Sequence, residues 1–153
     1  MKRPHWITQR TALALHERCM RLDGGGSGVR DSGLLESALM RPEHAWNYGK
    51  PSLCQLAALY AHGIARNHPF VDGNKRTAFL VCAVFLERNG LRLEAGQAET
   101  AVFVIALAAG KLEPEAFALW LEDNTTALRR KAPRAARSPR SPRSPRTPRR
   151  RKA

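Results

Sequence analysis

The chain has 153 residues, of which 43% are hydrophobic and 25% are charged, a composition typical of one ordinary globular domain. Its formal net charge of +13 is concentrated at one end. Residues 129–153 hold twelve Lys or Arg and no acid, whereas residues 1–128 hold fourteen basic and thirteen acidic side chains. The folded part is therefore nearly neutral, and the overall charge is no evidence that this part binds nucleic acid.

Several classes of protein are excluded by simple features. No apolar run approaches the ~20 residues that a membrane helix needs, and residues 1–6 lead into a mixed polar segment that does not resemble a signal peptide. The three cysteines are isolated among apolar neighbours, so we expect small core residues in place of a disulfide framework or a zinc site. They are Cys19, Cys54 and Cys82. We expect a cytoplasmic protein without a membrane partner.

The first predicted helix begins at Thr8, which can cap it, and ends at about Leu22. Four glycines within residues 24–28 follow, and they favour neither a helix nor a strand. No Gly-Lys-Ser or Gly-Lys-Thr follows these glycines, so the segment is not a phosphate-binding P-loop. We expect a flexible loop.

Two further helices are predicted before the middle of the chain. The first is short, over residues 33–40, with Asp31 or Ser32 as its cap and Pro42 just beyond its end. The second is capped by Ser52 and carries an apolar stripe at helical spacing. The stripe consists of Leu53, Leu56, Ala57, Tyr60 and Ile64.

The second half of the chain is also predicted to be helical. Residues 73–89 form the longest predicted helix, and because its middle is apolar on every side it should be the buried central helix. Gly90 ends it in a left-handed conformation, and residues 91–93 form a short extended piece. Helices over about 97–109 and 113–124 complete an all-α domain spanning residues 1–128.

Residues 129–153 differ in composition from the rest. They contain four Ser/Thr-Pro-Arg tripeptides in succession, and proline at every third position prevents a helix. With almost no apolar side chain to bury, the tail should be disordered and extended. Two interpretations stay open: the basic repeats bind RNA or the ribosome through phosphate neutralisation, or they are a low-complexity extension without a selected role.

One segment carries the chemistry: residues 68–77, His-Pro-Phe-Val-Asp-Gly-Asn-Lys-Arg-Thr, at the start of the predicted central helix. Free backbone N–H groups and the helix dipole favour an anion there. His68 can act as a general base, and Asp72 is a hard oxygen ligand suited to Mg²⁺. Phe70 should point inward and hold the loop. The candidate phosphate-binding residues are Gly73, Asn74, Lys75 and Arg76.

This segment resembles the His-x-Phe-x-Asp/Asn-x-Asn-Lys-Arg motif of the Fic/Doc family, in its Doc (death-on-curing) branch. Segments 28–39, 65–68 and 85–90 resemble Doc-type segments in the same order, so the likeness covers roughly residues 6–124. The resemblance implies a compact Fic-type helical fold and a toxin of a type II toxin–antitoxin pair. It further implies a kinase that transfers phosphate from ATP, with Mg²⁺, to a threonine of elongation factor Tu, and a Phd-like antitoxin that inserts a segment beside the site.

The resemblance carries over residue by residue: His68 as the general base, Asp72 as the Mg²⁺ ligand, and residues 73–76 around the phosphates. Fic enzymes that transfer AMP have a second glycine where this chain has Lys75, and a second arginine where it has Phe79. Both departures favour the kinase. The shared His-Pro and Gly73 keep protein AMP-transfer as the alternative. A non-catalytic, antitoxin-binding co-repressor is the alternative from another functional class.

Other polar residues have more ordinary interpretations. We expect the four histidines outside the motif to be surface or hydrogen-bonded core residues. They are His5, His16, His44 and His62. Arg66 either reaches phosphate or lies on the surface at its helix end. Arg30 and Asp31 should form a cap or an ion pair.

Overall fold

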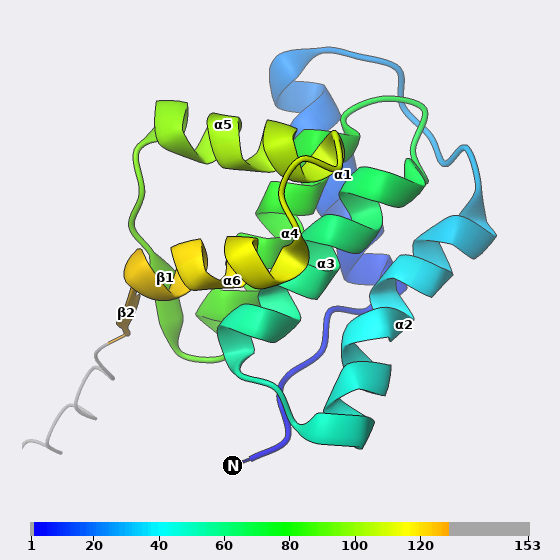
Figure 1. Cartoon of the computed structure of the whole chain (residues 1–153). Coiled ribbons are helices and arrows are strands. Elements are labelled where there is room, and N and C mark those ends of the chain that lie inside the picture. The colour runs from blue at the N-terminus through cyan, green and yellow to red at the C-terminus, as the bar shows by residue number, and fades with distance from the viewer. Residues whose placement is uncertain (1, 129–153) are drawn as a thin grey trace, which may run out of the picture.

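The computed structural model describes residues 2–128, and this part of the chain folds into six helices and one small sheet (Figure 1). The predicted all-α class is confirmed, whereas the tail predicted for residues 129–153 lies outside the described residues. None of the helices in residues 2–128 has the length and apolar character that crossing a bilayer requires. The elements are α1 (Gln9–Asp23), α2 (Ser32–Gly49), α3 (Leu53–Asn67), α4 (Asn74–Arg88), β1 (Leu91–Leu93), α5 (Gln97–Ala108), α6 (Pro114–Asp123) and β2 (Thr125–Ala127).

The core forms around α3 and α4, which lie against each other in the middle of the fold (Figure 1). Helix α3 also packs against α2, α5 and α6, and α4 packs against α1. The predicted central helix is α4, but α3 is the more enclosed of the two, since Phe79 and Val84 of α4 remain half-buried. An apolar sequence indicates burial but does not specify how many neighbouring helices cover it.

Helix α2 is longer than predicted and is the longest helix of the described chain. Its cap is Asp31, whose Oδ1 accepts a hydrogen bond of 3.0 Å from the backbone of Leu34. The predicted end at Met40 is wrong, because α2 continues through Pro42 to Gly49. The proline lacks the N–H that the Ala38 carbonyl would otherwise accept.

Burial explains why the helix tolerates this loss. The buried positions of α2 lie at helical spacing on both sides of the proline. They are Leu35, Ala38, Leu39, Pro42 and Trp46. The helix crosses α3 closely, since a Cβ atom added at Gly63 would lie 3.0 Å from the Ala38 side chain. Packing of the apolar face therefore outweighs the missing hydrogen bond.

The remaining predicted boundaries hold closely. Thr8 caps α1, and Ser52 forms a capping box with Gln55 at the start of α3. Gly90 has a φ of +88° after α4, in the left-handed region, as predicted. The extended piece at 91–93 is β1, which pairs antiparallel with β2. The sequence did not predict β2, because a three-residue strand depends on its partner.

The three cysteines lie in the interior, as expected for small core residues. Cys19, Cys54 and Cys82 are all buried, and Cys82 is completely enclosed. Burial raises the pKa of each thiol above its ordinary value, because the charged thiolate is poorly solvated there. These side chains therefore contribute packing to the core, not nucleophilic chemistry.

Candidate functional site

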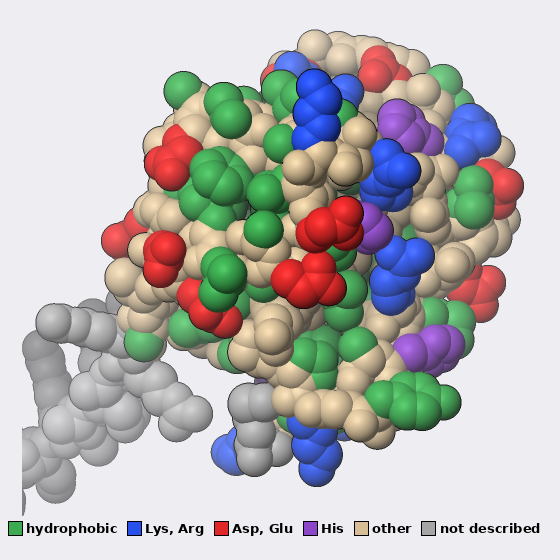
Figure 2. Space-filling view, in the orientation of Figure 1, with side chains coloured by type: hydrophobic (Ala, Val, Ile, Leu, Met, Phe, Trp, Pro, Cys, Tyr) green, Lys and Arg blue, Asp and Glu red, His purple; other side chains and the backbone are tan. Residues whose placement is uncertain are grey.

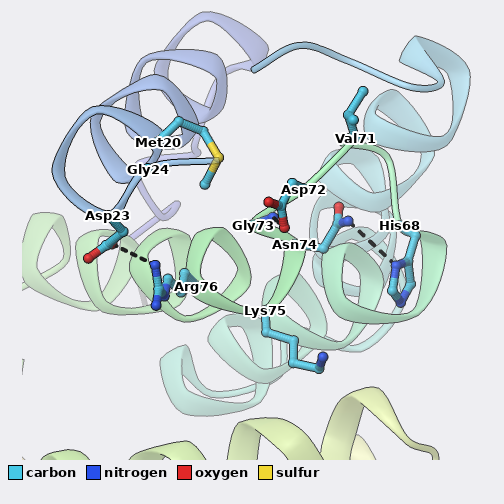
Figure 3. A pocket seen from close by; sticks show the side chains of 10 residues that line it. All are labelled: Met20, Asp23, Gly24, His68, Val71, Asp72, Gly73, Asn74, Lys75 and Arg76. Atoms are coloured by element: carbon cyan, nitrogen blue, oxygen red, sulfur yellow. Dashed lines mark hydrogen bonds and ion pairs between the residues drawn. The ribbon is translucent and has the colours of Figure 1, made fainter. Parts of the chain in front are cut away.

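The predicted motif forms the loop between α3 and α4 and the first turn of α4, and it borders a cavity of about 490 Å³ (Figure 3). All six predicted site residues line this cavity: His68, Asp72, Gly73, Asn74, Lys75 and Arg76. The other lining residues are Met20, Asp23, Gly24 and Val71. The cavity therefore lies between the motif and the end of α1.

His68 ends α3 in a left-handed conformation, with a φ of +49°, and its side chain is exposed beside the cavity. A non-glycine residue in this region is uncommon and is held there by its surroundings. The guanidinium of Arg30 donates from Nε to the His68 carbonyl (2.8 Å) and from Nη2 to the Asn67 carbonyl (3.0 Å). Arg30 thus fixes the backbone that carries the candidate base, whereas its neighbour Asp31 supplies the predicted cap, at the start of α2.

Asn74 holds the loop from the inside. Its Oδ1 accepts a hydrogen bond of 2.9 Å from the Phe70 backbone N–H, and its Nδ2 donates to the Phe70 carbonyl at 3.0 Å. The same Nδ2 lies 3.5 Å from Nδ1 of His68 (Figure 3). The side chain is buried, so its polar atoms serve the loop and orient His68. Its contribution to a phosphate would come from the backbone N–H.

His16 also contributes to this site, a role that the sequence analysis did not predict. It lies on α1, buried beneath the motif, and its Nε2 donates to the Asp72 carbonyl at 2.8 Å. Its ring stacks on Phe70, with 3.8 Å between centroids and 5° between the planes. Phe70 is itself buried, as predicted. Burial of His16 could be inferred from its spacing to Ala12 and Cys19, but its partner could not.

Two glycines allow α1 and the following loop to approach the motif. Gly73 has a φ of +73°, a conformation that other residues rarely adopt, and a Cβ atom there would displace the methyl group of Met20. Gly25, with a φ of +145°, lies so near Asp72 that a Cβ atom would be 2.8 Å from its Oδ2. The glycine-rich segment is therefore part of the cavity wall and not only a connection.

The segment before α2 supports the motif from the other side. Val29 and Phe70 form an antiparallel bridge. Two backbone hydrogen bonds flank it: Arg30 donates to the Pro69 carbonyl at 2.7 Å, and Val71 donates to the Gly28 carbonyl at 3.1 Å. The motif loop is thus held by α1 and by this segment, as well as by the two helices that it joins.

The charged groups around the cavity have different environments. The Oδ1 atom of Asp72 accepts a hydrogen bond of 2.7 Å from the Gly73 N–H, and the side chain is exposed. Arg76 pairs with Asp23, with 3.0 Å between Nη1 and Oδ2. Lys75 is exposed. Arg66, one of the residues that could have reached a phosphate, donates instead to the Ala108 carbonyl at the end of α5.

A second hollow, of about 580 Å³, lies between α4 and α5. Phe79, Val104 and Ile105 contribute to its apolar lining, and Lys75 and Arg76 border both hollows. Hydrophobic side chains also reach the surface over α5 and α6 (Figure 2), including the exposed Val102, Ile105 and Leu119. An apolar groove thus begins directly beside the motif.

Comparison with known proteins identifies related sequences. Residues 6–86 match the profile of the Fic/DOC family. The chain is 48% identical over 75 residues to the protein named Toxin Doc of Mycolicibacterium smegmatis, a match that covers 47% of this chain and 57% of that protein. It is 34% identical over 88 residues to the protein named Protein kinase doc of Escherichia phage P1, covering 57% of this chain and 70% of that protein. The first match thus spans little more than half of the relative's length. On the family match and these two relatives, the chain belongs to the Fic/DOC family, in its Doc branch.

Proposed function

We propose that this chain is a Doc-type toxin of a type II toxin–antitoxin system and acts as a protein kinase in the cytoplasm. Its substrate is a serine or threonine hydroxyl of a translation factor, elongation factor Tu by resemblance. One observation carries the proposal: a candidate base, an exposed carboxylate and two cations border the same cavity at the start of α4. The names of the two relatives, a Doc toxin and a Doc protein kinase, support it.

The start of α4 fits the phosphates of ATP. The backbone N–H groups of residues 74–76 belong to the first turn of α4, where the helix dipole also favours negative charge. Lys75 and Arg76 add charge-assisted hydrogen bonds. Asp72 offers an exposed carboxylate oxygen, and one carboxylate together with phosphate oxygens is a common set of ligands for Mg²⁺. When bound, the ion neutralises charge on the phosphates.

His68, held in place by Asn74 and Arg30, is the residue that promotes phosphoryl transfer. Bound ATP supplies the γ-phosphoryl group, which bonds to the attacking hydroxyl oxygen as the bond to the β-phosphate oxygen breaks and ADP leaves. His68 accepts the hydroxyl proton on its imidazole ring, which is exposed beside the cavity. Asn74 and Arg30 keep the loop in the conformation that presents this ring.

The surroundings of Lys75 and Phe79 favour kinase activity over AMP-transfer. Phe79 is half-buried and lines the apolar groove, so no anion-binding arginine stands where the AMP-transferring pattern has its second one. Lys75 borders the cavity where that pattern has its second glycine, and its side chain takes up space there. We therefore infer that the γ-phosphate, and not the α-phosphate, is presented to the acceptor.

The groove between α4 and α5 fits the antitoxin. An apolar face of a Phd-like segment would bury hydrophobic area against Phe79, Val104 and Ile105, directly beside the cations of the site. Binding there would cover Lys75 and so inhibit the enzyme. Contact with RNA through residues 129–153 is a separate proposal, which rests on the basic repeats alone.

A transfer assay tests the function directly. The full chain is incubated with Mg²⁺ and a cell lysate, together with ATP labelled at either the γ- or the α-phosphate. We expect label only from the γ position, on a band of the size of elongation factor Tu. His68→Ala should reduce transfer by about 10²- to 10⁴-fold, whereas the control His44→Ala, at an exposed position on α2, should not.

The other outcomes separate the alternatives. Label from the α-phosphate would establish AMP-transfer and contradict the inference from Lys75. Absence of transfer from both positions, with growth arrest unchanged in His68→Ala cells, would indicate a protein that acts by binding alone.

A further inference from the structure

Arg76, the third residue of α4, forms an ion pair within the protein. Arg76 Nη1 lies 3.0 Å from Oδ2 of Asp23, the last residue of α1 (Figure 3). The side chains are 60% and 43% exposed, so the pair lies at the solvent-facing edge of the cavity. The two residues are far apart in the sequence and meet only because α1 lies against α4.

The position of Asp23 is not explained by the stability of its own helix. A carboxylate at the C-terminal end of a helix lies near the negative end of the helix dipole, where a cation is preferred. Its counter-charge comes from Arg76 on another element. The placement therefore serves the cavity more directly than it serves α1.

Asp23 also changes the charge of the cavity. The charged side chains of the lining are two carboxylates, Asp23 and Asp72, and two cations, Lys75 and Arg76. Their formal charges cancel, although the proposed ligand is a polyanion. A triphosphate would have to replace Asp23 on Arg76 or bind beside an unneutralised carboxylate. Because exposed ion pairs are weak, such a replacement is feasible.

We propose that Asp23 sets the phosphate affinity of the site: it holds Arg76 in an ion pair that the nucleotide must replace, and so makes binding depend strongly on a divalent cation. The inference rests on the proposed nucleotide-binding function and adds the control of that binding. With a cation bound beside Asp72, the cavity gains the positive charge that Asp23 cancels. Without the cation, the two carboxylates of the cavity, Asp23 and Asp72, repel the phosphates.

Calorimetric titration of the full chain with ATP tests the proposal, once with EDTA and once with Mg²⁺. Asp23→Asn removes the charge with little change of shape, and an uncharged residue is not disfavoured at the end of α1. We expect it to bind ATP about three- to tenfold more tightly in EDTA, with a smaller gain on adding Mg²⁺. Inorganic triphosphate should show the same change, because it carries the phosphates without the base and sugar.

Two variants make the measurement specific. Glu17→Gln also removes one negative charge from α1 and breaks an exposed ion pair, with Arg21, but Glu17 does not line the cavity. It should bind ATP as the unmodified protein does. In an Arg76→Ala background, Asp23→Asn should have a clearly smaller effect, because the ion pair is already absent.

Each outcome is decisive. Equal ATP affinity in the unmodified protein and Asp23→Asn would overturn the role of Asp23 and leave the proposed function intact. An equal gain in Glu17→Gln would also overturn it, because net charge alone would then explain the effect. If neither protein binds ATP in either condition, Asp23 does not limit binding, and the proposed function is contradicted as well.

Discussion

The last two turns of α4 and the motif loop before this helix are held by different kinds of contact. Toward the C-terminal end, Val81, Cys82, Phe85 and Leu86 are buried in apolar packing against neighbouring elements. At the start, the motif loop depends on individual polar groups that come from other parts of the chain, chiefly His16 and Arg30. Helix α4 thus connects an apolar region that stabilises the fold to a polar loop that positions the site residues.

The difference matters because the two kinds of contact fail in different ways. Apolar packing is distributed over many atoms and has no strict direction, so its loss reduces the free energy of unfolding. A hydrogen bond to the motif loop is directional and comes from one side chain. Its loss should displace His68 or Asp72 while the core stays folded. Substitutions in the two regions should therefore separate stability from activity.

The largest effect on stability is expected in the apolar region. Phe85 is completely buried and lies against Trp6 and Tyr60, with ring centroids 6.1 and 5.0 Å apart. Phe85→Ala removes these contacts and leaves a cavity, so we expect a loss of about 3–5 kcal/mol in the free energy of unfolding. Urea denaturation followed by circular dichroism measures it.

A matched control is Leu119→Ala on α6, where the side chain is 63% exposed. We expect it to change stability by less than about 0.5 kcal/mol. If Phe85→Ala and Leu119→Ala lower the free energy of unfolding equally, the distinction between a packed core and an exposed apolar face is wrong.

A smaller effect on stability, but a clear one on activity, is expected at Arg30. Arg30→Ala removes the two hydrogen bonds that hold the carbonyls of Asn67 and His68. Because Arg30 is exposed, we expect about 1 kcal/mol or less in stability, but about a tenfold lower transfer rate through misplacement of His68. The KM for ATP should stay unchanged, which separates this role from phosphate binding.

Arg30→Lys tests the geometry, because lysine keeps the charge but cannot make the same two-pronged contact. Arg30→Lys should restore only the part of the transfer rate that depends on the positive charge. Full activity in Arg30→Ala would show that the bridge between Val29 and Phe70 is sufficient to hold the loop.

The smallest effect is a pH dependence at His62 of α3, away from the motif. Burial, with a contribution from the neighbouring charge of Arg41, lowers the pKa of His62 below its ordinary value of 6.5. Arg41 Nη1 lies 3.0 Å from Nδ1 of His62 and donates to the neutral ring. Below about pH 6.5 the unfolded chain binds this proton more readily than the folded chain, so stability decreases as the pH falls further.

His62→Gln should remove this small part of the acid sensitivity without affecting transfer. Urea denaturation at pH 5 and pH 7.5 compares the two proteins. An identical loss on acidification in both would exclude His62 as its source.

Much of the fold was predictable from local signals. Thr8 and Ser52 begin helices because their side chains accept from free backbone N–H groups, and Gly90 ends one because glycine adopts a positive φ at little cost. Pro42 shows the limit of this reasoning. Its local preference predicts a helix end, but burial of α2 on both sides of it keeps the helix continuous.

For the site, the sequence by itself determined the chemical groups and their order along the chain. The base, carboxylate and cations lie within nine residues at the start of a helix, so the short connection along the chain keeps them near one another. Only the tertiary structure decided what surrounds them: His16 beneath Asp72, Arg30 on the His68 carbonyl and Asp23 on Arg76. The physical reason is that these contacts join residues 38 to 56 positions apart, and such pairings depend on how the helices pack and not on local preference.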